Sequence, residues 1–297
     1  MKNTERGFLL LTSCLGDPNR KPLSTAQMRH LADRTWQLDT AGEERELTPE
    51  DLIALGYGRP MARRILDLLA QEEELDHYLS RAKRLGCIPL TRVSPGYPLE
   101  LRRRLGLDSP GVLWAKGDPE LLNLPKIALV GSRELGAENR AFAEEAGRQA
   151  ALQGFCLVSG NARGADRTAQ EACLAQGGRV ISVVADELWR HESRENVLYL
   201  SEEDFDQPFS ALRALSRNRC IHALGAKTLV SQATCGMGGT WDGTVKNLRF
   251  GWSHVFCFDD GSEAARQLIQ MGAAAVQPAD LTNLTALQPK FQNFFDQ

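Results

Sequence analysis

Three short glycine-containing loops carry the residue types that bind phosphate. Each combines glycine with a hydroxyl or guanidinium side chain, and each follows a short apolar run that predicts a strand. Glycine lets the backbone approach an anion closely, amides at the start of a following helix point toward it, and arginine can bind a phosphate through two hydrogen bonds. The loops are Gly131-Ser132-Arg133, Ser159-Gly160-Asn161-Ala162-Arg163-Gly164-Ala165-Asp166 and Gly236-Met237-Gly238-Gly239-Thr240.

These loops match neither of the common nucleotide-binding motifs. The sequence has no G-x-x-x-x-G-K-S/T and no G-x-G-x-x-G. Each glycine taken alone could serve only a tight turn, but three such loops in one sheet favour an anion-binding cradle. The candidate DNA- or phosphate-binding residues are Gly131, Ser132, Arg133, Ser159, Gly160, Arg163, Asp166, Arg217, Asn218, Arg219, Gly238, Gly239, Thr240 and Lys246.

Positive charge is concentrated in one segment of an acidic chain. The whole chain of 297 residues has a net charge of -3, so any basic surface must be local. Residues 210–250 nevertheless hold six basic residues, against Asp242 as the only acid. A nucleic-acid backbone is the natural partner of such a patch, whereas a solvated helix face is the alternative. The run Arg217-Asn218-Arg219 favours the first interpretation, because apolar residues follow it on the same helix.

The elements that would position these loops alternate between strand and helix. From Lys126 onward, short apolar runs at 127–130, 156–158, 180–184, 227–230 and 254–258 predict strands, and amphipathic segments between them predict helices. This alternation predicts an α/β fold, a Rossmann-like, doubly wound and mostly parallel sheet. In such a sheet, ligands bind at the carboxyl ends of the strands, where the three loops lie.

The chain before this sheet has a different character. Residues 1–85 predict a small all-helical domain of the helix-hairpin-helix (SAM-like) type, and residues 86–297 the Rossmann-fold domain. The proline-rich stretch from 88 to about 120 predicts a linker that becomes the edge of that second domain. The sequence around Gly56 and Gly58 resembles a helix-hairpin-helix. Its glycine amides, with Arg59 and Arg63 beside them, could contact a second phosphate, or the hairpin could be a packing unit only.

A series of motifs runs in order from about residue 88 to about 280. These are Tyr97-Pro98, Leu113-Trp114-Ala115-Lys116-Gly117-Asp118, Val130-Gly131-Ser132-Arg133, Ser159-Gly160-x-Ala162-Arg163-Gly164-x-Asp166, residues 174–184, Arg217-Asn218-Arg219-x-Ile221 and Met271-Gly272-Ala273. Together they resemble the DNA-processing protein A (DprA/Smf) family. The resemblance implies an extended Rossmann-like fold and a phosphate-lined pocket for single-stranded DNA. It also implies a homodimer that hands the strand to a recombinase.

Departures from the family pattern keep two alternatives open. Gln232-Ala233 stands where the family commonly has Glu-Ala, and the segment after Ala279 is too short for the winged-helix domain of many members. A divergent member of this kind could act in bacterial antiphage defence, as the antitoxin of a phosphoribosyltransferase-like toxin. The loop from Gly238 also leans toward nucleotide-binding sensors and nucleotide-processing enzymes, although the motif Pro-Gly-Gly-x-Gly-Thr-x-x-Glu of those enzymes is absent.

The sequence offers little support for catalysis, a metal or a cofactor. Asp166 could act as a general base, but no histidine or serine partner is placed beside it. We expect it to cap the following helix and to orient Arg163. The five histidines lack metal-ligand spacing, and the seven cysteines form no CxxC pair. Reduced thiols fit a cytoplasmic protein, and no apolar run is long enough to span a membrane. We therefore expect no catalytic residue, no metal and no cofactor.

Overall fold

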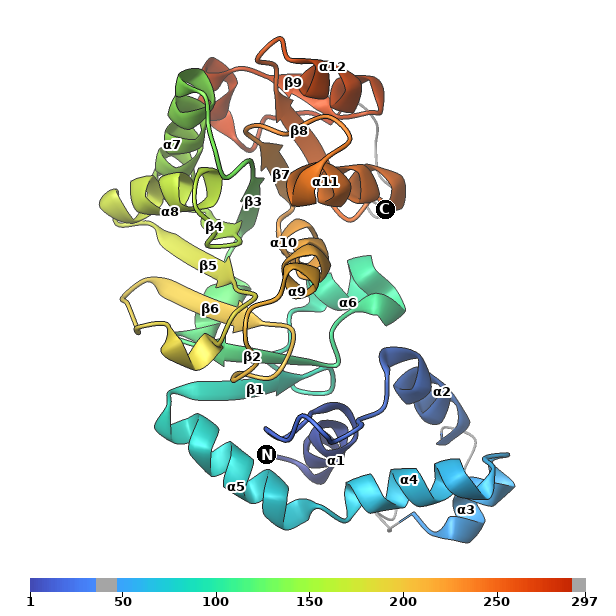
Figure 1. Cartoon of the computed structure of the whole chain (residues 1–297). Helices are drawn as coiled ribbons and strands as arrows, with labels where there is room; N and C mark the ends of the chain where they lie inside the picture. Colours follow the sequence, from blue (N-terminus) through green and yellow to red (C-terminus); the bar gives the residue numbers. More distant parts are fainter. Residues whose placement is uncertain (36–46, 290–297) are drawn as a thin grey trace.

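The computed structural model describes residues 1–35 and 47–289 of the chain (Figure 1). Its helices are α1 (Asn3–Thr12), α2 (Thr25–Thr35), α3 (Pro49–Ala54), α4 (Arg59–Leu69), α5 (Glu72–Arg84), α6 (Leu99–Leu105), α7 (Ala137–Leu152), α8 (Ala165–Ala175), α9 (Ala211–Ser216), α10 (Asn218–Leu224), α11 (Gly238–Phe250) and α12 (Glu263–Gln270). Its strands are β1 (Cys87–Thr91), β2 (Val112–Lys116), β3 (Lys126–Val130), β4 (Cys156–Ser159), β5 (Arg179–Val183), β6 (Val197–Ser201), β7 (Lys227–Val230), β8 (His254–Phe258) and β9 (Ala274–Val276).

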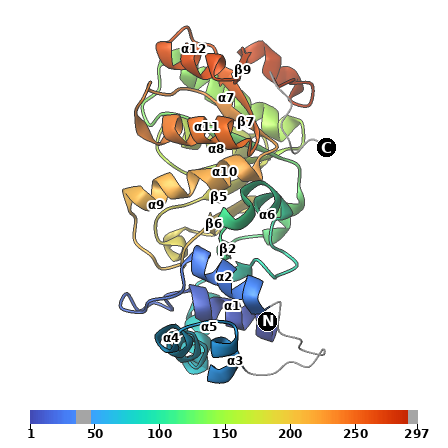
Figure 2. The same ribbon diagram turned by 90° about the vertical axis from the view of Figure 1, so that its right-hand side faces the viewer.

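Within the described residues, the nine strands form one sheet in the order β1-β2-β6-β5-β4-β3-β7-β8-β9. The strands from β6 to β9 in this order run parallel, whereas β1 and β2 pair antiparallel at one edge. Helices α7 and α8 cover one face, and α6, α9, α10 and α11 cover the other (Figures 1 and 2). The predicted α/β, Rossmann-like and mostly parallel fold is confirmed.

Both faces of the sheet are buried because successive side chains of a strand point to opposite sides. In β3, Ile127 and Leu129 join the apolar cluster beneath α7 and α8. Ala128 and Val130 join the cluster beneath α6 and α10. This explains the continuous apolar runs in the sequence, since neither face of these strands meets water.

The N-terminal helices form a smaller unit docked on the antiparallel edge of the sheet. Thr48 begins α3 as a capping box with Asp51, as its sequence favours. Residues of α1, α2, α3 and α4 share a small core of their own. Leu9, Leu75 and Tyr78 instead pack into the large cluster together with Trp114 of β2. None of the helices in the described ranges has the length and apolar character needed to cross a membrane.

Three details of the secondary structure differ from expectation. The proline-rich stretch predicted as a linker contains strands β1 and β2, whose residues pair one to one from Cys87–Lys116 to Thr91–Val112. Pro89 is accommodated there because β1 is an edge strand. Strands β6 and β9 lie outside the runs from which strands are predicted. Finally, α11 begins at Gly238, ahead of the predicted start at Thr244. Gly238 enters the helix at a φ of +85°, a conformation that favours glycine.

Candidate anion-binding site

The candidate residues gather at the point where the chain reverses its direction of travel across the sheet. From β3 the chain moves outward through β4, β5 and β6, and it returns to the other side of β3 as β7. The loops that follow β3 and β7 therefore diverge and leave a crevice at the carboxyl ends of these strands. A cavity of about 630 Å³ lies in this crevice, and one of about 310 Å³ adjoins it. Arg133, Ala162 and Arg217 line both cavities.

The loop after β4 is folded around the carboxylate of Asp166. This carboxylate accepts hydrogen bonds from the backbone amides of Gly160 and Ala162, each at 3.1 Å. Asn161, between them, has a φ of 58°, a left-handed conformation that asparagine tolerates better than most residues. Asp166 therefore holds the loop in shape from beneath, a role that the sequence did not suggest.

Glycine at position 164 lets two loops lie against each other. Gly164 has a φ of +86°, and a Cβ there would lie 2.4 Å from the carbonyl oxygen of Ser132 and 2.5 Å from that of Arg133. The amide of Ala165 donates a 3.1 Å hydrogen bond to the Ser132 carbonyl oxygen. The loops after β3 and β4 thus form one continuous wall of the cavity.

Arg217 is buried at the junction of α9 and α10 and faces this wall. Its guanidinium donates a 2.9 Å hydrogen bond to the Gly160 carbonyl oxygen, and a Cβ at Gly160 would overlap the guanidinium. Its Nε is buried and has no hydrogen-bond partner among the described residues. Burial raises the pKa of Asp166, and the nearby Arg217 charge opposes that rise. Burial likewise lowers the pKa of Arg217, but a guanidinium remains protonated in proteins.

Two exposed arginines complete the positive side of the site. Arg133 lines both cavities and makes no hydrogen bond or ion pair with any described residue. Arg163 forms an ion pair with Glu134 at 3.2 Å, with 72% and 89% of the two side chains exposed. An ion pair this exposed contributes little stability and is easily exchanged for a ligand. The expected contact between Asp166 and Arg163 is not formed, because Asp166 is occupied by the loop amides.

The opposite wall is the start of α11. Thr240 donates a 2.9 Å hydrogen bond to the carbonyl oxygen of Gly131, and Asn218 donates one of 3.1 Å to that of Gly239. Met237 precedes the helix without capping it through a side chain. The first amides of α11 and the positive end of its dipole therefore face the cavity, an arrangement that favours a bound anion.

Three candidate side chains do not face the cavity. The Ser159 hydroxyl is buried and accepts a hydrogen bond from Gln170. Arg219 is bound to Glu202 by an ion pair of 2.8 Å on the far side of α10. Lys246 pairs with Asp242 one helical turn away, also at 2.8 Å. The expectation that Arg219 and Lys246 add charge to this cavity is therefore wrong, because each lies beside its own carboxylate partner.

The N-terminal hairpin lies at the other end of the molecule from this cavity (Figure 1). Gly58 precedes α4, and Gly56 has a φ of +83° in the turn before it. Arg34 donates a 2.7 Å hydrogen bond to the Leu55 carbonyl oxygen and closes this turn. Arg59 and Arg63 lie on α4, where Arg63 is 4.0 Å from Asp67. The hairpin and the cavity are thus separate surfaces.

The sequence did not reveal the apolar side chains at the rim of the cavity. Phe209 is 57% exposed and lines the smaller space, while Leu215 and Met237, 45% and 69% exposed, line the larger one. Leu212 of α9 is 76% exposed. Large apolar residues exposed together beside a polar cavity mark a binding surface. The only sequence signal was the i,i+3 spacing of Leu212 and Leu215 on one face of α9.

Comparison with known proteins agrees with the motifs. The family model described as DNA recombination-mediator protein A matches residues 89–285. The chain belongs to this family. Among its relatives, the DNA processing protein DprA of Bacillus subtilis is 29% identical over 216 residues, which cover 67% of this chain and 71% of that protein. The DNA processing protein DprA of Streptococcus pneumoniae is 30% identical over 57% of this chain and 64% of that protein.

Solved structures show the same fold. The DprA structure from Streptococcus pneumoniae aligns with a TM-score of 0.68 at 23% identity, covering 90% of this chain and 99% of that one. A Helicobacter pylori DprA structure aligns with a TM-score of 0.56 at 23% identity, covering 66% of this chain and 94% of that one. The first alignment includes most of the N-terminal helices as well as the sheet.

Proposed function

We propose that this member of the family binds single-stranded DNA in the cavity between β3 and β7 and acts in DNA processing or recombination. Its relatives in Bacillus subtilis and Streptococcus pneumoniae are named DNA processing proteins. The Helicobacter pylori structure with the same fold is described as showing a single-stranded DNA binding mode. The groups proposed to contact the phosphates are the guanidinium groups of Arg133, Arg163 and Arg217 and the amides of Gly238, Gly239 and Thr240. Ser132, a candidate from the sequence, lines the same cavity, but its amide and hydroxyl both donate to the Gln232 carbonyl oxygen.

The observation that carries this proposal is the combination of exposed cations with exposed apolar side chains. Arg133 and Arg163 can reach phosphates, and Phe209, Leu215 and Met237 lie at the edges of the same cavities. In a duplex the base faces are stacked inside and cannot cover apolar side chains. Unpaired bases can stack on them while the backbone follows the arginines. The site therefore fits a single strand better than a duplex.

Binding without catalysis is the second part of the proposal. The two groups of the cavity best suited to acid–base chemistry are engaged in structural roles. Asp166 accepts two amide hydrogen bonds and is buried. His222 lies against Thr228 and Asn247, and burial lowers its pKa to about 3, so it remains neutral near neutral pH. The burial of both groups supports binding without catalysis.

We further propose that the protein acts as a homodimer and passes the strand to a recombinase. Both parts rest on the family resemblance alone. A cognate toxin is the alternative partner. Purification of the protein from its host, with identification of any chain that elutes with it, distinguishes a recombinase from a toxin.

The direct test is a salt series of binding to fluorescent oligonucleotides, single- and double-stranded. We expect the single strand to bind more tightly, with an affinity that falls steeply as salt rises. Arg133→Ala/Arg163→Ala should weaken binding and reduce the salt slope by about 0.7 for each phosphate that no longer meets an arginine. The matched control is Arg84→Ala/Arg103→Ala, which removes two exposed arginines remote from these cavities.

Two outcomes would contradict the proposal. Equal loss of affinity in the control pair would show that binding depends on overall charge and not on this cavity. Displacement of the strand by low concentrations of a mononucleotide would show that the cavity holds one small ligand. A cavity of about 630 Å³ is large enough for that.

A further inference from the structure

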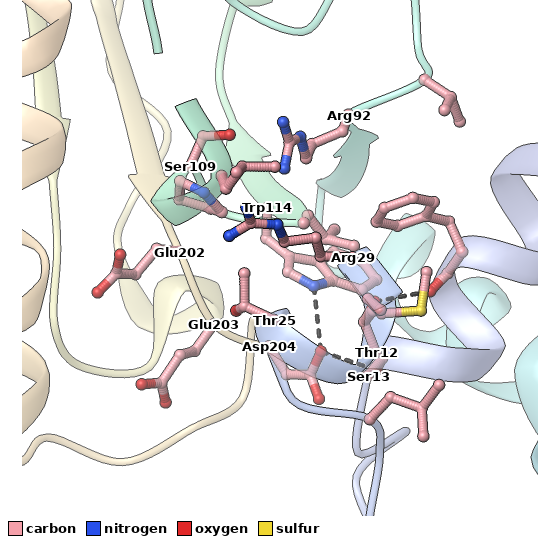
Figure 3. Close-up of a pocket in the computed structure, with 18 of the residues that line it drawn as sticks. Thr12, Ser13, Thr25, Arg29, Arg92, Ser109, Trp114, Glu202, Glu203 and Asp204 are labelled. Atoms are coloured by element: carbon pink, nitrogen blue, oxygen red, sulfur yellow. Dashed lines mark hydrogen bonds between the residues drawn. The ribbon is translucent and has the colours of Figure 1, made fainter. Parts of the chain in front are cut away.

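A separate cavity of about 510 Å³ lies between the N-terminal helices and the antiparallel edge of the sheet (Figure 3). One wall is a single face of α2, with Thr25, Met28 and Arg29 at helical spacing. The facing wall comes from the segment after β1 and from α6 and the loop that follows it. The cavity therefore exists only because the two parts of the chain are docked.

Three arginines from three different elements converge on this cavity. Arg29 belongs to α2, Arg92 directly follows β1, and Arg102 belongs to α6. Arg29 and Arg102 are exposed and make no hydrogen bond or ion pair with a described residue. Arg92 donates one hydrogen bond, of 3.1 Å, to the Gly106 carbonyl oxygen. Most of the donor capacity of these guanidinium groups is unused by the described residues.

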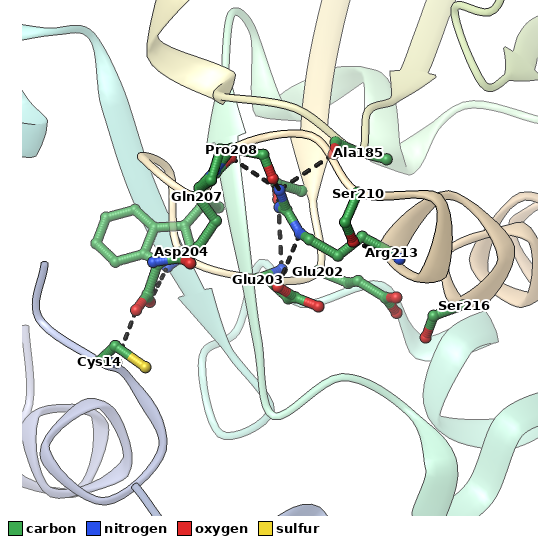
Figure 4. Close-up of polar contacts among 12 residues, drawn as sticks. Cys14, Ala185, Glu202, Glu203, Asp204, Gln207, Pro208, Ser210, Arg213 and Ser216 are labelled. Carbon is green, nitrogen blue, oxygen red and sulfur yellow. Dashed lines mark hydrogen bonds and ion pairs between the residues drawn. The ribbon is translucent and has the colours of Figure 1, made fainter. Parts of the chain in front are cut away.

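Two of the acidic side chains around the cavity are paired with other arginines, and Figure 4 shows one of these pairs, Glu203 with Arg213. Glu202 pairs with Arg219 at 2.8 Å, and Glu203 pairs with Arg213 at 2.7 Å. The other two acids of the lining, Asp33 and Asp204, form no ion pair within the described part of the chain. The three arginines therefore outnumber the unpaired carboxylates of the lining by one positive charge.

Asp204 fixes the two walls relative to each other. Its carboxylate accepts hydrogen bonds from the Ser13 hydroxyl and the Cys14 amide, each at 2.7 Å, and from the Trp114 indole at 3.2 Å. The first two donors follow α1 and the third lies in β2 (Figure 3). The segment after α1 and strand β2 are thus tied together, so the cavity is formed before any ligand arrives, which lowers the cost of binding one.

We propose that this interdomain cavity is a second phosphate-binding site, in which Arg29, Arg92 and Arg102 bind a phosphate-bearing ligand. Guanidinium groups bind phosphate oxygens through paired, charge-assisted hydrogen bonds. The ligand could be a free nucleotide or a further stretch of a bound strand. A bound strand could reach this cavity, because the two cavities are lined by neighbouring residues. Leu215 and Arg217 line the cavity between β3 and β7, the first site, and Ser216 and Arg219 line this one. The inference that the ligand is part of a bound DNA strand rests on the proposed function, whereas the inference of a phosphate site does not.

The test uses inorganic pyrophosphate as the first probe, measured by calorimetry on the full chain carrying Arg133→Ala/Arg163→Ala. This background weakens the first site. We expect Arg29→Ala/Arg102→Ala, added to it, to weaken pyrophosphate binding about tenfold or more. Arg84→Ala/Arg103→Ala, added to the same background, removes equal charge and should leave binding unchanged. All four side chains are exposed, so the variants should fold, and thermal unfolding checks this.

The second probe is a long thymidine oligonucleotide bound to the chain with an intact first site. If Arg29→Ala/Arg102→Ala weakens both probes, the ligand is a strand that spans the two sites. If it weakens pyrophosphate binding alone, the ligand is a small phosphate compound. Equal pyrophosphate binding by the Arg29/Arg102 and control variants, or no binding by the background protein, overturns the proposal. Failure of the oligonucleotide to bind at all would refute the proposed function and leave the pyrophosphate result to decide this site.

Discussion

Replacing Arg217 by methionine tests whether the buried arginine and Asp166 act as one unit. Methionine approximates the length of the arginine side chain but carries no charge and donates no hydrogen bond. The change removes the 2.9 Å bond to the Gly160 carbonyl oxygen and leaves Asp166 buried without its main opposing charge. The loop after β4 then has to accommodate an uncompensated carboxylate.

The expected loss follows from that isolated charge. Arg217 and Asp166 form no direct ion pair, so the loss should lie below the roughly 3–5 kcal/mol of a broken buried pair. Loss of the charge-assisted hydrogen bond to Gly160 is itself worth about 1.5–3 kcal/mol. A domain has about 5–15 kcal/mol of stability in total, so the Arg217→Met variant should be folded but clearly weakened. Asp166→Asn/Arg217→Met removes the isolated charge, and the asparagine oxygen can still accept from the Gly160 and Ala162 amides. We expect the double variant to be more stable than Arg217→Met by about 1–3 kcal/mol.

The pH dependence gives an independent check of the same reasoning. Burial already raises the pKa of Asp166, and loss of Arg217 should raise it further. A carboxyl group whose pKa is raised by folding destabilises the protein once pH exceeds its unfolded value of about 4. The deficit of Arg217→Met should therefore be largest at neutral pH and should shrink as pH falls toward about 4.

Denaturant unfolding of the three proteins across this pH range measures all these quantities. The reasoning is refuted if Arg217→Met loses less than about 1 kcal/mol, or if the double variant is no more stable than the single one. Recovery of stability in the double variant without recovery of DNA binding would separate the structural role of Arg217 from its contact with phosphate.

Three further predictions concern other parts of the molecule. Gly164→Ala should cost more than about 2 kcal/mol, whereas Gly177→Ala, also at positive φ but with open space around its Cβ, should cost about 1 kcal/mol. Thermal unfolding of both variants compares them, and equal losses would refute the close contact of the two loops. Burial raises the pKa of Asp204 to about 6. The free energy of unfolding should therefore fall by up to about 3 kcal/mol as pH rises from about 4 past 6. Asp204→Asn should remove this pH dependence of stability. Denaturant midpoints at several pH values test it, and a slope retained in the variant would contradict it. Phe209→Ala should weaken single-strand binding by about 1–3 kcal/mol without loss of thermal stability, and unchanged affinity would remove base stacking from the proposed site.

The sequence predicted most of the sheet because its strands are encoded locally. The runs that became β3, β4, β5, β7 and β8 are mostly apolar, and most of them end at glycine- or serine-containing loops. Of the strands it missed, β2 and β6 are apolar runs too, and β1 has the clearest reason to be missed. Residues 87–91 contain Pro89, which disfavours a strand, and they become an edge strand by pairing with β2. No local pattern contains that pairing.

Arg217 and Arg219 show the same division at the candidate site. The sequence placed both beside the phosphate loops, because they share a short basic run. Helical residues that are two positions apart in the sequence point in directions about 200° apart. The side chains of Arg217 and Arg219 therefore leave the helical segment on opposite sides. One meets Gly160, 57 residues away, and the other meets Glu202, 17 residues away.

The sequence by itself determined the fold class, the glycine loops and the family, since these depend on apolar periodicity, local turn chemistry and ordered motifs. The tertiary structure alone decided which arginines remain free to bind an anion. In the folded chain, Arg219 and Lys246 form ion pairs and Arg217 is buried against a loop. Arg133 has no hydrogen-bond or ion-pair partner among the described residues. The tertiary structure also formed the interdomain cavity, because docking brought together arginines of α2 and α6 that lie far apart along the chain. Charge compensation depends on distance in space, and the order of residues does not specify it.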